Sequence, residues 1–333
     1  MGFSFAENKT AQSLRHSIKK ISISLLPTPT DVRKSLRLLV YIFIGGVVLY
    51  PLMIRLPVLG WDWYFFFNAH NPVDNIYSPL SPFFPYTRYI IQLFTWMPWR
   101  DSLAILAGMT YMALALGTWV SGGKYGSIAM ALFTPLPIFV LWVGHPDGLA
   151  LAGMITGIIP LALIKPQITF WSFLRNKAFI FWLVITFGLI FLLWPGWLPN
   201  AFRIHWDHSG SFGWQALGWP LIIIGVILLA GAGNDPWKLM ASGCFLTPDL
   251  MVYHIIVLLP AIGKAPKWWK GVVWVCAWLI LLGTGFGGYF RYIDLLFPLS
   301  IYLSLQTPQN YKKTLLGHIS TVRGVKNWIL QWI

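Results

Sequence analysis

Apolar runs long enough to cross a lipid bilayer recur along almost the whole chain, and they restrict its fold more than any other feature of the sequence. Hydrophobic residues make up 57% of the chain, charged residues make up 10%, and the mean hydropathy is +0.65. A hydrocarbon core of about 30 Å requires roughly 20 helical residues. Because backbone groups in lipid must hydrogen-bond within the protein, we predict an all-α polytopic membrane protein.

The predicted transmembrane domain covers residues 36–306 and contains about ten membrane segments. These segments lie near residues 37–57, 102–120, 126–143, 148–164, 178–194, 219–232, a broken pair at 238–248 and 250–263, 271–288 and 292–306. Residues 1–35 form a basic segment that is either an amphipathic helix on an anionic leaflet or a disordered tail. Residues 307–333 form a basic tail. Short interfacial helices are expected in two outer loops, 59–89 and 195–218.

The net charge of +14 reflects membrane topology, and no nucleic-acid partner is expected, because the basic residues stand at the ends of apolar runs instead of forming one patch. With both termini in the cytoplasm, all but five of the 24 Lys and Arg residues face inward. The five outer ones are Arg55, Arg88, Arg100, Arg203 and Arg291. This asymmetry predicts a multi-pass protein of the cell inner (plasma) membrane, in contact with membrane lipids.

The outer face gathers ionisable groups suited to acid–base chemistry. Seven of the ten acidic residues and five of the seven histidines fall there: Asp62, Asp74, Asp101, Asp147, Asp207, Asp249, Asp294, His70, His145, His205, His208 and His254. Taken singly, each can be an ordinary solvated loop residue. The outer arginines suit lipid phosphate, although extension to headgroups is the alternative, favoured for Arg55. The collective asymmetry favours the outer face as the functional face.

Asp62 lies in an aromatic, proline-rich outer loop, Gly60 to Tyr89, just after the first segment. A carboxylate among aromatic rings at a membrane surface is partly desolvated, which suits a general base. Capping of a short helix is the competing role. Cys244 and Cys276 fall inside apolar runs, so no disulfide framework is predicted.

Asp62 with its YSP loop resembles the GT-C glycosyltransferases. Four motifs in order, over roughly residues 40–265, resemble glycosyltransferase family eighty-seven, the polyprenyl-phosphate-mannose-dependent mannosyltransferases. They are this loop, Gly144 to Gly148 with the following helix ending in LALIKPQ, HSGSFGWQAL at 208–217, and LTPDLMVYHIIVLLPAI, which contains His254. The resemblance implies a GT-C-like bundle and a hexosyltransferase. Lys165 and Pro166 match the family too, but the topology favours a structural helix end on the cytoplasmic side.

The resemblance implies inverting transfer of a sugar, a mannosyl group in that family, from a polyprenyl phosphate to a lipid or glycan acceptor, with Asp62 as general base. The residues expected to bind phosphate or substrate are His254, Arg203, Arg88, Arg291, Asp249, Asp147 and His145. No cofactor is predicted. The H-x-D-H sequence at 205–208 permits a metal ion, but none is expected there. The main alternative is a noncatalytic GT-C-like subunit of a membrane complex, and a lipid carrier is a third.

Overall fold

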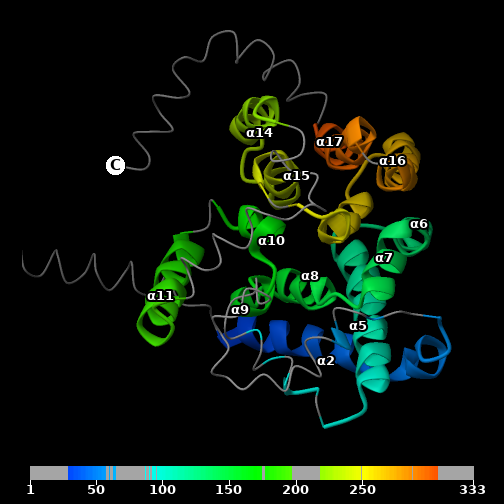
Figure 1. The fold of residues 1–333 in the computed structure, drawn as a ribbon, viewed down its shortest axis with the longest axis vertical. Coiled ribbons are helices and arrows are strands. Elements are labelled where there is room, and N and C mark those ends of the chain that lie inside the picture. The colour runs from blue at the N-terminus through cyan, green and yellow to red at the C-terminus, as the bar shows by residue number, and fades with distance from the viewer. Residues whose placement is uncertain are drawn as a thin grey trace, which may run out of the picture.

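The fold is seen in a computed structural model that describes residues 29–57, 60, 63–64, 87, 90, 92–94, 96–174, 177–196, 218–248, 250–286 and 288–306 (Figure 1). Within these ranges the chain is mostly helical and contains no strand. The predicted all-α class is therefore confirmed. Residues 1–28 of the first basic segment, all of the C-terminal segment 307–333 and most of both predicted outer loops lie outside the described residues. Residues 29–35 of the first segment belong instead to a helix that begins at Pro29.

The helices follow one another with short connections. In chain order they are α2 (Pro29–Met53), α5 (Trp99–Val120), α6 (Tyr125–Leu132), α7 (Pro135–Val143), α8 (Asp147–Thr156), α9 (Ile159–Ala162), α10 (Pro166–Ser172), α11 (Lys177–Leu193), α14 (Pro220–Gly231), α15 (Pro236–Leu246), the 3₁₀ helix η2 (Val252–Gly263), α16 (Lys267–Phe286), the 3₁₀ helix η3 (Gly288–Leu295) and α17 (Leu296–Ser304).

Helices α2 and α5 form the most extensive pair in the bundle. The Tyr50 hydroxyl near the end of α2 donates to the Asp101 carboxylate in the first turn of α5, which places the end of α2 beside the start of α5. Met53, Ala104 and Ala107 are buried between them. This pair forms one wall against which α8 packs (Figure 1).

The centre of the bundle is η2, whose residues from His254 to Gly263 are all buried. It contacts α5, α6, α7, α8, α10, α15, α16 and α17. The chain is irregular between Leu246 and Val252, around Pro248, as the predicted broken pair requires. Because other helices of the protein cover η2, this short helix does not have to be long enough to cross a membrane.

The described residues contain fewer candidate membrane-crossing helices than the sequence predicts. Among the described residues, three helices are long and apolar enough to cross a membrane, Val32–Met53, Trp99–Val120 and Lys267–Phe286. The pair Tyr125–Leu132 and Pro135–Val143, bent by 45°, makes a fourth if it is one span. The prediction of about ten spans is thus not supported, because several apolar runs form shorter helices.

The predicted span at 148–164 is the clearest correction. α8 ends at Thr156 and is followed by Gly157, whose φ of +74° is a left-handed conformation that glycine adopts at low cost. The chain then turns back, so that Ala162 of α9 lies against Gly153 of α8. Residues 147–165 therefore form a short helical hairpin instead of one crossing helix, and Lys165 is brought back towards the start of α8.

Candidate functional site

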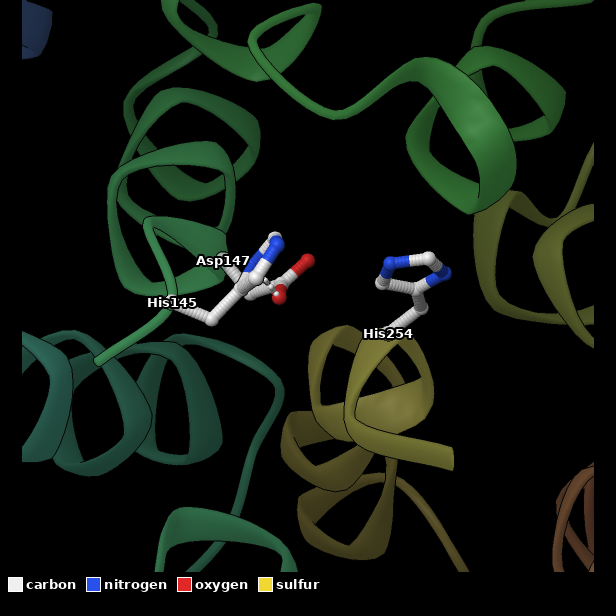
Figure 2. Close-up of side chains that lie close together, drawn as sticks. All are labelled: His145, Asp147 and His254. Atoms are coloured by element: carbon white, nitrogen blue, oxygen red, sulfur yellow. Dashed lines mark ion pairs between the residues drawn. The ribbon is translucent and has the colours of Figure 1, made fainter. Parts of the chain in front are cut away.

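Four ionisable side chains meet in the interior of the bundle. They are His145, Asp147, Lys165 and His254, with exposed fractions of only 3%, 1%, 6% and 3%. We refer to these four residues as the buried cluster. Figure 2 shows His145 and Asp147 extending from one side towards His254, which projects from η2. Ionisable groups are rarely buried in a membrane protein without a role in binding or proton transfer, so this cluster is the candidate site.

Asp147 and His145 are placed by the turn between α7 and α8. α7 ends at Gly144, which has a φ of +77°, and Asp147 is the first residue of α8. A carboxylate at this position interacts favourably with the positive end of the helix dipole. Oδ2 of Asp147 lies against Nδ1 of His145. A proton on Nδ1 would face this carboxylate and would leave Nε2 as the basic nitrogen.

His145 itself stays uncharged at neutral pH. It lies in the connection between α7 and α8, outside the four candidate spans. Burial, and after it the positive charge of Lys165, hold the pKa of this imidazole well below its usual range. The Tyr253 ring covers it, with the two ring centroids 4.6 Å apart. The dyad thus presents a neutral base fixed by a carboxylate.

His254 is held by both of its ring nitrogens. The backbone N–H of Met251 donates to Nδ1 over 3.2 Å, and Nζ of Lys165 lies 3.0 Å from Nε2. A neutral imidazole that accepts at Nδ1 carries its proton on Nε2. If Lys165 is charged, two hydrogen-bond donors therefore face each other. An oxygen anion between them would accept from both, whereas an uncharged Lys165 would accept directly from Nε2.

Lys165 is the functional candidate that the sequence reasoning misplaced. It stands at a helix boundary, as predicted, but its side chain is buried beside His254 because the hairpin of α8 and α9 turns it into the interior. The predicted cytoplasmic side remains a prediction. Pro166 does not stop a helix but begins α10, where its missing N–H costs nothing.

A metal ion fits this site poorly, although its geometry invites one. One ligand atom each from His145, Asp147 and His254 lies within 4.8 Å of the others. However, Lys165 brings a positive charge to Nε2 of His254, and the other ring nitrogen accepts a hydrogen bond from Met251. A metal-bound imidazole normally donates from its second nitrogen. The donor set therefore favours an anion over a cation.

Two described residues of the predicted first outer loop, Gly60 and Trp63, lie beside the residue that precedes His145. Gly60 donates its N–H to the carbonyl of Trp142 over 2.9 Å, and Trp63 is fully buried, with its indole N–H donating to Ser102. A Cβ added to Gly144 would lie 2.8 Å from Cα of Gly60 and 2.9 Å from Cβ of Trp63. Only glycine permits this approach at the residue before His145.

The structure therefore brings together three of the predicted binding residues, His145, Asp147 and His254. Arg291 lies in η3, where it interacts with the buried carboxylate of Asp294. The remaining predicted residues lie outside the described part of the chain: Asp62, Arg88, Arg203 and Asp249, together with the H-x-D-H sequence at 205–208. The prediction that no metal is bound remains a prediction.

Comparison of the chain with models of protein families, with curated proteins and with solved structures finds no match. The assignment of function therefore depends on the residues themselves.

Proposed function

We propose that the protein transfers a sugar, a mannosyl group by its resemblance to family eighty-seven, from a polyprenyl phosphate to a lipid or glycan acceptor at the outer side of the inner membrane. The acceptor oxygen bonds to the anomeric carbon as the bond from that carbon to the phosphate oxygen breaks. The acceptor proton passes to Asp62, and the configuration inverts.

The observation that supports this proposal is the direct contact between Lys165 Nζ and His254 Nε2, which lie 3.0 Å apart inside the bundle. The donor phosphodiester carries one negative charge, and the departing phosphate carries a second. Donors fixed at this point therefore stabilise the leaving group more than the bound donor, which lowers the barrier. Lys165 has a flexible side chain and can move aside to admit a phosphate oxygen.

The position of the loop residues agrees with a role for Asp62. This residue is two positions after Gly60 and one before Trp63, and both of those contact Gly144. Gly144 in turn precedes His145 of the dyad. In the proposed arrangement, the dyad accepts a hydrogen bond from a sugar or acceptor hydroxyl at Nε2 of His145 while Asp62 takes the transferred proton.

The alternative is a noncatalytic subunit of a membrane complex, and one observation favours it. Each member of the buried cluster is at most 6% exposed, and its charges already have partners within the cluster. Buried charges that are already paired with one another fit a purely structural role, in which they hold α8, α10 and η2 in register. The enzyme requires Lys165 and Asp62 for sugar transfer, whereas the noncatalytic subunit does not.

The test measures donor consumption, because that requires no knowledge of the acceptor. Membranes containing the full chain receive polyprenyl-phosphate mannose labelled in the sugar, and release of polyprenyl phosphate is followed. We expect Asp62→Asn and Lys165→Met each to lower the rate at least about 100-fold. The matched control is Lys124→Met, which replaces an exposed lysine just before α6 and should retain the wild-type rate. Wild-type rates in both site variants would overturn the enzyme and favour the subunit.

A further inference from the structure

A second site lies at the end of the bundle opposite the first outer loop. It is formed by the end of α5, the end of α10, the α14–α15 turn and the η2–α16 turn, and we refer to it as the lysine end because Lys124, Lys264 and Lys267 are exposed there. A cavity of about 830 Å³ opens at this end. Ligand sites in proteins have volumes of roughly 300–1,000 Å³, so the cavity is large enough for part of an amphiphile.

The cavity has two chemically different parts. Its apolar part is lined by Met154, Ile155, Leu239 and Met240, which come from α8 and α15. Its polar part is lined by Ser121, Ser172, Asn234 and Lys264, which stand at helix ends and turns. Trp237 lines it as well, and tryptophan is the side chain most typical of the membrane–water interface. This division matches a molecule with an apolar chain and a polar head.

The charges beside the cavity select the sign of that head. Asp235 caps α15 by accepting from the backbone N–H groups of Trp237 and Lys238, and it also pairs with Lys264. Lys238, nearly buried beside the Tyr302 ring, interacts with both Asp235 and Lys264. Two lysines thus share one carboxylate, which leaves one positive charge in excess. An anionic head would neutralise it.

We infer that this cavity is a binding site for the phosphate-bearing head and proximal chain of an anionic phospholipid. The phosphate lies at Lys264 and Asn234, and the first part of an acyl chain lies along Met154 and Leu239. Basic residues near a membrane surface attract anionic lipid, and here the cavity adds a shaped apolar contact to that attraction. The site is separate from the buried cluster, and the inference does not depend on glycosyl transfer.

The test is lipid binding by the purified full-length protein, measured by native mass spectrometry from detergent. Phosphatidylglycerol should remain bound more than phosphatidylcholine with the same chains. Lys264→Ala should weaken phosphatidylglycerol binding about fivefold, the effect of one basic residue at a membrane surface. Arg100→Ala, which removes an exposed cation at the opposite end of α5, should leave it unchanged. Met154→Trp, which fills the apolar part without changing charge, should reduce the binding of both lipids.

Two outcomes would overturn the inference. Equal retention of the two lipids, with no change in Lys264→Ala, would show that no anionic site exists. Displacement of phosphatidylglycerol by an equal concentration of soluble sn-glycerol phosphate would show that the site binds phosphate. The ligand would then be a free metabolite and not a lipid. Circular dichroism of each variant separates loss of binding from loss of fold. Met154→Trp and Lys264→Ala must both weaken phosphatidylglycerol binding.

Discussion

The buried cluster and the lysine end contain the same kinds of groups, lysines beside an aspartate, in opposite surroundings. Lys165 and Asp147 are almost completely enclosed, whereas Lys264 and Asp235 have side chains that are 47% and 17% exposed. Water and salt screen the exposed pair, so its charges attract ligands without greatly stabilising the fold. In the interior, each charge depends on its partner, and loss of either leaves an uncompensated charge.

Asp147→Ala should have the largest effect on stability, about 3–5 kcal/mol, because it removes a buried carboxylate that lies against His145 and interacts electrostatically with the buried Lys165. The measurement is thermal unfolding in detergent, followed by the fluorescence of the 20 tryptophans. Asp235→Ala is the matched control at the lysine end. If the two variants lost equal stability, the contrast between the regions would be wrong.

The double variant Asp147→Asn with Lys165→Met should recover about 2–3 kcal/mol relative to the sum of the single variants, because both buried charges are removed together. A double-mutant cycle by the same unfolding measurement gives this coupling energy. Donor consumption provides the second reading. Recovered stability without recovered transfer supports the proposed enzyme, whereas recovered assembly of a membrane complex supports the noncatalytic subunit.

His254→Phe should cost about 1–2 kcal/mol, since the N–H of Met251 loses its acceptor while the ring volume is kept. The expected local sign is faster hydrogen exchange in the peptide that spans the start of η2. Tyr302→Phe, beside Lys238 at the lysine end, serves as the control and should leave this exchange unchanged. Unchanged hydrogen exchange in His254→Phe would contradict the role of the imidazole as acceptor for the Met251 N–H.

Lys264→Ala should have the smallest effect on stability, about 0.5 kcal/mol or less, because its ion pair is exposed. The difference from the wild type should disappear as salt is raised to 1 M, where the screening length falls to about 3 Å. A larger, salt-independent loss would mean that the pair is part of the core and would weaken the contrast with the buried cluster.

Sequence reasoning predicted the features that depend on composition and local breaks. The helical class followed from the length of the apolar runs, and the break before His254 followed from Pro248. The hairpin at 147–165 was missed because hydropathy reports how apolar a run is and not whether it reverses direction at Gly157. Lys165 was then placed in the cytoplasm by a charge rule. Its contact with His254, 89 residues away, depends on tertiary packing that no local pattern reveals.

The short helices α8, α9 and α10 constrain the order in which the protein can be assembled during synthesis. They contain 10, 4 and 7 residues, so even the longest extends only about 15 Å, half of the hydrocarbon thickness. Their open ends and Lys165 cannot remain in lipid. α15 and η2, which cover them, begin only at Pro236 and Val252. A nascent chain that stops before Pro236 would therefore expose this segment. Proteases of membrane quality control would then recognise the chain as incompletely folded.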